Sequence, residues 1–313
     1  MVTLPDLVEA RERVRGVLRP TPVEPSDSLS GLARRPVLLK PEHRQRTGSF
    51  KIRGAYNLIC RLQPGAEVVA ASAGNHAQGV ALAATLTGLR STVFMPTGAS
   101  APKVNATRAY GATVRLEGDV YDDAMAAARL YAEDTGAVLV PPFDHPLVIA
   151  GQGTVGLELL EEAREVETVV VPVGGGGLIS GVAAALRLSG HRARIVGVQA
   201  AGAAAVWRSL RAGHLVVLDS VSTMADGIAP RSPSELTLEH VRAYVDDVVT
   251  VTEDELARAM LLLLERAKAV VEPAGAAAVA ALLAAKVTGD GPALAVVSGG
   301  NVDLHLLSRL IGA

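Results

Sequence analysis

The sequence predicts an α/β protein in which helices cover both faces of mostly parallel sheets. Short apolar runs rich in Val alternate with longer Ala- and Leu-rich runs of helical period, and this alternation is typical of parallel strands joined by crossover helices. The strand segments are continuously apolar, as expected for sheets buried on both faces. Two Pro-bearing segments, 63–65 and 140–142, bracket a compact block of alternating strands and helices. We therefore expect two α/β domains.

The expected strands are apolar segments of four residues each: 37–40, 68–71, 92–95, 113–116, 137–140, 168–171, 195–198 and 294–297. Helical periodicity predicts helices between them, at 77–87, 101–110, 121–134, 154–163, 178–188, 253–269 and 274–285, and an amphipathic helix within 1–19. The expected small α/β domain, residues 63–140, is inserted into a large domain made of 1–62 and 141–313. Ligands of such folds bind beyond the carboxyl ends of the strands.

Composition excludes several classes of function. A net charge of -2 and 3% aromatic residues argue against nucleic-acid binding. The N-terminus lacks the apolar core of a signal peptide, and the longest apolar run, 274–285, is too short to span a bilayer, which needs about 20 residues. The single cysteine, Cys60, excludes an internal disulfide and argues against a thiolate metal cluster. We expect a cytoplasmic protein that binds neither nucleic acid nor membrane, with Cys60 as a small buried residue.

Four consecutive glycines, Gly174–Gly177, follow an expected strand and precede an expected helix. Without Cβ atoms, successive N–H groups can surround an anion, and the helix N-terminus adds partial positive charge. The alternatives are a plain turn and a dinucleotide site. The dinucleotide pattern G-x-G-x-x-G would start at Gly176 and end at Gly181, but its middle glycine is replaced by Leu178. A phosphate monoester therefore fits better than a dinucleotide.

Two further loops of small polar residues follow expected strands. The loop Ser72–Gly79 offers a hydroxyl, amides and a helix start, which suits a carboxylate; its His76 is either a general base or a histidine hydrogen-bonded at the helix start. The loop Ser298–Asn301 offers a hydroxyl beside two glycines, or is a simple turn.

Lys51 is one of only five lysines and has Phe50 and Ile52 as neighbours. Alone, such a lysine is usually a solvated surface residue. In an uncharged setting its pKa falls and it can act as a nucleophile or base. With the three loops described above in the same chain, a phosphorylated carbonyl cofactor that forms a Schiff base with Lys51 is plausible.

These motifs, in this order, resemble the pyridoxal-phosphate enzymes of the threonine/serine dehydratase and serine racemase family, which have the tryptophan-synthase-β-like fold (fold type II). The resemblance extends over nearly the whole chain. It is carried by Thr21-Pro22-Val23, Lys40-Pro41-Glu42, 47–55, 72–79, 150–154, 173–177, 225–227, Glu272-Pro273 and 297–303.

The resemblance implies two open, twisted, mostly parallel sheets, pyridoxal 5'-phosphate as cofactor, and a homodimer or homotetramer. It implies the following residue roles: Lys51 as Schiff-base lysine and Cα base; Phe50 packed on the cofactor ring; Gly174, Gly175, Gly176, Gly177 and the Leu178 N–H on the phosphate; Asn75 on the ring hydroxyl; Ser298 at the pyridine nitrogen; Ser72, Ala73, Gly74, Asn75 and His76 on the substrate carboxylate; and Asp226 and Glu272 on the substrate side. Asp226 could also be a turn residue before Gly227.

The implied reaction is β-elimination. Lys51 takes the Cα proton of L-threonine or L-serine, the β-hydroxyl leaves, and the released product hydrolyses to a 2-keto acid and ammonia. Alternatives are a dehydratase for another β-hydroxy amino acid, such as 3-hydroxyaspartate or a hydroxyectoine-pathway intermediate, and a serine racemase. A catalytically silent binding protein on the same fold is disfavoured by the intact Lys51.

Three departures from the family pattern narrow these alternatives. Racemases carry a serine where this chain has Ala73, and alanine cannot transfer a proton. The positions of two metal-binding carboxylates read Gln199 and Ala205, so we expect no metal there. The chain stops at Ala313, so we do not expect an appended regulatory domain. Trp207, in the following Ala-rich stretch, is either a core or a subunit-interface residue.

Overall fold

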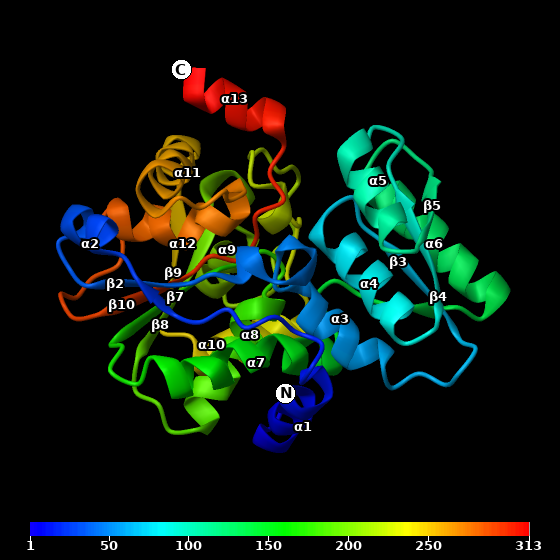
Figure 1. Ribbon diagram of the computed structural model, residues 1–313, viewed down its shortest axis with the longest axis horizontal. Coiled ribbons are helices and arrows are strands. Elements are labelled where there is room, and N and C mark those ends of the chain that lie inside the picture. Colours follow the sequence, from blue (N-terminus) through cyan, green and yellow to red (C-terminus); the bar gives the residue numbers. More distant parts are fainter. Residues whose placement is uncertain (313) are drawn as a thin grey trace.

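The computed structural model describes residues 1–312, which form two sheets (Figure 1). The larger sheet has six strands in the order β1-β2-β10-β7-β8-β9. Its strands are β1 (Glu24–Pro25), β2 (Val37–Lys40), β10 (Ala293–Val296), β7 (Thr168–Pro172), β8 (Arg194–Ala200) and β9 (Asp247–Val251). Only the β1–β2 pair is antiparallel. The carboxyl ends of the five parallel strands therefore meet at one edge.

The smaller sheet has four parallel strands in the order β5-β4-β3-β6. They are β5 (Thr113–Leu116), β4 (Arg90–Met95), β3 (Glu67–Ala71) and β6 (Val138–Leu139). This sheet and the helices α4, α5 and α6 (67–139) are called the small lobe, and the rest of the chain the large lobe. In Figure 1 the small lobe lies on the right, in cyan and green. It falls within the expected domain 63–140, whose boundaries remain a prediction.

The helices are α1 (Leu4–Val14), α2 (Asp27–Ala33), α3 (Lys51–Ile59), α4 (Asn75–Leu86), α5 (Ala101–Ala109), α6 (Tyr121–Thr135), α7 (Pro146–Glu162), α8 (Gly177–Leu188), α9 (Ala205–Ala212), α10 (Glu235–Tyr244), α11 (Glu253–Ala267), α12 (Pro273–Leu283) and α13 (Leu304–Gly312). None of them is long and apolar enough to cross a membrane, counting the described residues 1–312.

Both faces of the central strands of each sheet are buried, whereas the edge strand β5 is mostly exposed. In β7, Val170 packs in the apolar cluster of α11 and α12, whereas Val169 and Val171 pack in the cluster of α7 and α8. In β3, Val68 packs with residues of α3 and α4, and Val69 packs with residues of α6. This alternation explains the continuous apolar strands and confirms the predicted fold class.

Some element bounds differ from those expected. Strands β1 and β9 were not predicted, and the expected strand 137–140 is reduced to two residues in β6. Helix α7 begins at Pro146, well before the expected 154. Its glycines weaken the helical pattern, but they permit close packing, because a Cβ on Gly151 would lie 2.6 Å from the carbonyl oxygen of Arg53.

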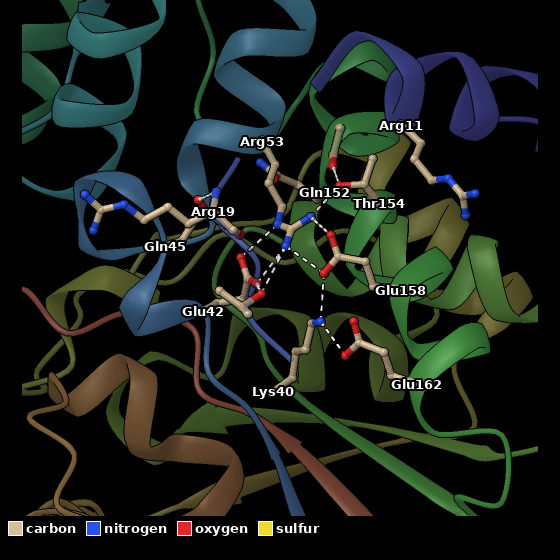
Figure 2. A network of polar contacts seen from close by, with 12 residues as sticks. Arg11, Arg19, Lys40, Glu42, Gln45, Arg53, Gln152, Thr154, Glu158 and Glu162 are labelled. Carbon is tan, nitrogen blue, oxygen red and sulfur yellow. Dashed lines mark hydrogen bonds and ion pairs between the residues drawn. The ribbon is translucent and has the colours of Figure 1, made fainter. Parts of the chain in front are cut away.

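A buried ionic network joins α3 to α7 and β2 (Figure 2). The guanidinium of Arg53, which is fully buried, donates to both oxygens of Glu42 at 2.8 Å and to both oxygens of Glu158 at 2.6 and 2.9 Å. Lys40, also fully buried, lies between Glu158 at 2.7 Å and Glu162 at 3.0 Å. Burial alone would lower the pKa of Arg53, but Glu42 and Glu158 raise it. Helix α3, which begins at Lys51, is thereby held against the large sheet.

Candidate active site

Lys51 is the first residue of α3, and its amine lies in the protein interior. Nζ donates to the carbonyl oxygen of Pro142 at 2.8 Å and lies 5.3 Å from the centre of the Phe50 ring. The side chain keeps some accessible surface, yet burial of the amine lowers its pKa to about 8, although the nearby Glu272 opposes this effect. Near neutral pH this lysine exchanges its proton readily, as a general base must.

The glycine loop predicted for phosphate joins β7 to α8. Gly176 has φ +95°, in the left-handed region that side chains disfavour, and α8 begins at Gly177. A Cβ on Gly175 would lie 2.4 Å from the Phe143 ring. Because Phe143 follows the carbonyl that accepts from Lys51, the glycine loop and the lysine flank the same two residues, Pro142 and Phe143.

Ser298 lies two residues after the end of β10, which runs between β2 and β7. Its carbonyl accepts from the Phe50 N–H at 3.2 Å, and the next residue, Gly299, forms a bridge with Ser49. The Ser298 hydroxyl is buried, with only a long contact of 3.5 Å to the Ala274 carbonyl. The structure therefore brings Ser298 beside the Phe50–Lys51 step, although they are far apart in the sequence.

The loop from Ser72 to His76 contributes from the small lobe. The Ser72 hydroxyl accepts from the Gly74 N–H at 3.1 Å, and α4 begins at Asn75. Asn75 Nδ2 donates to Glu272 Oε1 at 2.6 Å, and Asn75 Oδ1 accepts from Asn301 at 2.7 Å. Residues 72–75, including Ala73, keep accessible surface, as a substrate-binding loop requires.

His76 is buried and donates its Nε2 proton to the Val140 carbonyl at 2.8 Å. Burial, together with the charge of Lys51, lowers its pKa to about 3. The ring is therefore neutral at ordinary pH. This hydrogen bond supports the structural interpretation of His76 over a role as general base.

Glu272 is the N-cap residue of α12, but its carboxylate does not cap the helix. It is buried, points to Asn75, and would lie 2.2 Å from a Cβ on Gly299. Burial and then the charge of Asp226 raise the pKa of this carboxyl to about 7. Asn75 and Lys51 are its neighbours, and its role on the substrate side remains a prediction.

Asp226 lies in a short 3-10 turn, Asp226–Ile228, and its side chain is 65% exposed. The carboxylate forms an ion pair with Lys103 of α5 at 2.6 Å. The structure therefore brings Asp226 to the rim of the site, where a cation of the small lobe already engages it.

The residues present fit pyridoxal phosphate. A glycine loop at the N-terminus of α8 supplies N–H donors for a phosphate, with Leu178 buried in the first turn. Lys51 supplies an amine with a lowered pKa, and Phe50 an aromatic ring next to it. When bound, this cofactor makes the Cα proton of an amino acid acidic by withdrawing electrons through its ring.

Comparison with known proteins agrees with this site. The family described as pyridoxal-phosphate dependent enzymes matches residues 14–299. The chain belongs to this family. Pyridoxal phosphate is accordingly its cofactor, and the fold is the one that the sequence resemblance implied.

Three relatives within the pyridoxal-phosphate dependent enzymes are closely similar. The L-threonine ammonia-lyase of Thermotoga maritima is 49% identical over 315 residues, which cover 99% of this chain and 78% of that protein. The structure of the T.th. threonine deaminase is 42% identical, with TM-score 0.91, covering 96% and 99% of the two chains. Maize serine racemase is 37% identical, with TM-score 0.94, covering 99% and 97%.

Gln199, where the sequence resemblance implied a carboxylate in metal-binding members, lies in a neutral network. Gln199 Nε2 donates to the carbonyls of Val173 and Ala203, both at 3.3 Å, and Gln199 Oε1 accepts from the Trp207 N–H at 2.8 Å. Ala205 offers no ligand atom. No group of three or more His, Cys, Asp or Glu able to hold a metal occurs in residues 1–312. Metal independence remains a prediction.

Sequence reasoning missed three residues of the site. Phe143 touches the glycine loop, Asn301 holds Asn75, and Lys103 pairs with Asp226. Asn301 lies within the recognised loop 298–301, so its polarity was a usable signal. Lys103 carried only one signal, the scarcity of lysine in this chain. Phe143 carried none, since its contact depends on the tertiary approach of two loops.

Proposed function

We propose that this protein is an L-threonine ammonia-lyase that also accepts L-serine. The observation that carries the proposal is Lys51: a buried amine with pKa lowered to about 8, beside a phosphate-binding glycine loop. The named activities of the Thermotoga maritima and T.th. relatives support the substrate class.

Different residues of this chain bind the substrate and transfer the proton. The loop from Ser72 to Asn75 presents a hydroxyl, N–H groups and a helix N-terminus, which bind a carboxylate. Lys51 accepts the Cα proton, and the amine holds it next to the Pro142 carbonyl. Over the elimination as a whole, the β-hydroxyl and the proton removed from Cα are lost together as one water. The resulting enamine then adds water at Cα and releases ammonia, which gives the 2-keto acid.

Near neutral pH, His76 and Glu272 place little net charge beside the amine of Lys51. His76 is neutral, and Glu272 with a pKa of about 7 carries only a fractional charge at neutral pH. A full negative charge beside Lys51 would stabilise its ammonium form and weaken it as a base. The partly protonated Glu272 leaves Lys51 available for proton transfer.

A substrate panel tests the proposal directly. The purified holoenzyme is incubated with L-threonine, L-serine and L-threo-3-hydroxyaspartate, and 2-keto acid is measured over time. We expect keto acid from threonine and, more slowly, from serine. Keto acid from 3-hydroxyaspartate alone would move the assignment to a sister dehydratase, and none from any of the three would contradict β-elimination.

The likeness to maize serine racemase makes racemisation the second candidate. Ala73 supplies no hydroxyl that could return a proton to the opposite face of Cα. We therefore expect chiral analysis of residual serine to show no D-serine above the rate of the cofactor alone. A D-serine yield comparable with keto-acid formation would overturn this expectation.

We also propose that the protein is a cytoplasmic homodimer or homotetramer with domains at 63–140 and at 1–62 plus 141–313. Helix α13 supports association, because none of its residues is buried and the side chain of Leu304 is 73% exposed. Sedimentation velocity of the holoenzyme at micromolar concentration measures the assembly, and a monomer there would contradict it.

A further inference from the structure

One segment of the large lobe, Ala225–Arg231, reaches the small lobe through two ion pairs of opposite polarity. Asp226 Oδ2 lies 2.6 Å from the amine of Lys103 on α5, and Arg231 Nη1 lies 3.6 Å from Asp122 Oδ2 on α6. This stretch is called the bridging segment. Because it supplies an acid to one helix and a base to the next, it holds the small lobe in one orientation.

The bridging segment also touches the groups that bind the cofactor and the substrate. A Cβ on Gly174 would lie 3.0 Å from the Ile228 Cα atom, so the first glycine of the phosphate loop packs directly on the segment. A Cβ on Gly227 would lie 3.0 Å from the Ala274 Cβ atom and 3.8 Å from Glu272 Oε1. A movement of Asp226 toward or away from Lys103 is thus transmitted to both places.

Lys103 is largely buried although it pairs with an exposed carboxylate. Its side chain is only 23% exposed, although its partner Asp226 is 65% exposed. Its charge opposes the burial that raises the pKa of Glu272, and it adds to the backbone hydrogen bonds that lower the pKa of Asp303, just after the Ser298 loop. Lys103 therefore pairs with Asp226, and its charge also acts to lower the pKa of Glu272 and of Asp303 in the large lobe.

Another polar contact between the lobes lies inside the site. Asn75, at the start of α4, donates to Glu272 and accepts from Asn301, both of the large lobe. The Lys103–Asp226 pair stands at the rim and the Asn75 pair in the interior, so together they fix the loop Ser72–Asn75 opposite Lys51. An open small lobe would lose both.

We propose that Lys103 is a positioning residue: by pairing with Asp226 it holds the small lobe closed over the substrate, and it does not itself contact the reacting atoms. The proposal rests on the proposed ammonia-lyase function and assigns Asp226 to lobe closure in place of direct substrate binding. A substrate that binds the closed form has its apparent affinity reduced by whatever fraction of the protein is open.

The kinetic test uses Lys103→Met, Asp226→Asn and their double variant as holoenzymes. We expect each single variant to raise KM for L-threonine on the order of tenfold, with kcat changed less than about twofold. The double variant should be no worse than either single one, because both remove the same pair. Lys103→Arg should restore KM to within about threefold, and raising the salt concentration should increase KM only where the pair is intact.

Arg194→Met is the matched control. Arg194 pairs with Asp247 at 2.9 Å within the large sheet, at a similar exposure and away from the site. Its KM should stay within about twofold of wild type. Equal effects in the control and in Lys103→Met would mean that any lost surface ion pair acts through stability, and would overturn the proposal.

Hydrogen–deuterium exchange of the substrate-free holoenzyme gives a readout independent of turnover. Peptides covering 96–110 and 222–234 should exchange faster in Lys103→Met than in wild type, whereas a peptide covering 194–200 should not change. Unchanged exchange in the first two peptides would refute lobe closure by this pair even if threonine is turned over. Faster exchange in a protein that turns over no hydroxy amino acid would refute only the proposed function.

A direct role of Lys103 in substrate binding predicts a different pattern. In that case Lys103→Met would raise KM strongly, Asp226→Asn would not, and the two effects would not be coupled. That outcome would also overturn the proposal.

Discussion

Two lysines near the N-terminus of the large lobe, Lys40 and Lys51, have opposite surroundings. Lys40 is fully buried, and its amine lies between the carboxylates of Glu158 and Glu162, as Figure 2 shows. Among residues 1–312, no carboxylate pairs with the amine of Lys51. The amine donates to a backbone carbonyl, and burial lowers its pKa to about 8. One lysine is neutralised by partners and serves the structure. The other lacks them and is free to exchange a proton.

The comparison shows that burial alone does not make a lysine reactive. A buried cation with matched anions stays charged, whereas a buried cation without them becomes a better base. Arg53, also on α3, follows the first rule through Glu42 and Glu158. The reactive amine is thus held by a helix whose own buried charge is fully paired.

Replacing Lys51 should have the largest effect. We expect Lys51→Ala to lower kcat/KM by at least about 10⁴-fold, because it removes the Cα base and the cofactor attachment point. Cofactor should also be lost on gel filtration, measured by phosphate and visible absorbance. Turnover and a stable visible band in this variant would contradict the role of Lys51.

Replacing Lys40 should cost stability and not chemistry. Lys40→Met leaves Glu158 and Glu162 without their shared cation, and we expect a loss of about 3 kcal/mol in the free energy of unfolding. Urea unfolding of the holoenzyme measures it, and cofactor attachment at low temperature should persist. If Lys40→Met were stable but inactive, the division between a structural and a chemical lysine would fail.

The pH dependence of cofactor binding to the apoenzyme tests whether the pKa of Lys51 is lowered. Capture needs the neutral amine, which is populated above its pKa, so its rate should rise with pH through about 8 and then level off. An ordinary lysine would show the rise only near 10.5. Glu272→Gln should shift the midpoint below that of wild type, because Glu272 raises the pKa of Lys51. Stopped-flow absorbance of the apoenzyme mixed with pyridoxal phosphate measures both midpoints.

Metal removal should have the smallest effect. Gln199 resembles Lys40 in that all its polar atoms have partners, here the carbonyls of Val173 and Ala203 and the Trp207 N–H. We expect dialysis against a chelator, followed by Mg²⁺ or Ca²⁺, to change kcat/KM by less than about twofold. A reversible loss of activity would mean that a cation binds at another place in the fold.

The fold was largely predictable because its signals are local. The apolar runs at 37–40, 168–171 and 113–116 coincide with β2, β7 and β5 within one residue at each end. The two-residue β1 is too short to show such a run. Strand β9 contains Val248, Val249 and Val251, a signal as strong as that of β5, and it could have been recognised. The predicted helix 154–163 misses the first turns of α7. Glycines in these turns allow close packing against α3, but they weaken the helical pattern in the sequence.

The places of two site motifs in the fold were predictable. The glycine loop and the Ser298 loop each follow an expected strand, whereas Lys51 begins α3, a helix that the sequence analysis did not predict. The Lys103–Asp226 pair was not predictable, because it joins two lobes and depends on how they meet. The hydrogen bonds of Asn75 with Glu272 and Asn301 also depend on how the two lobes pack together. Contacts between residues of different lobes leave no periodic pattern in the sequence, so they could not be predicted from it.

The position of β10 has a consequence for synthesis of the chain. This strand, Ala293–Val296, is synthesised after every other strand of the large sheet, yet it lies between β2 and β7. The small lobe is complete by residue 139 and can fold on the nascent chain, whereas β2 must wait for its partner until residue 296 has been added. Premature termination before residue 293 would therefore release a folded small lobe joined to an open, aggregation-prone sheet edge.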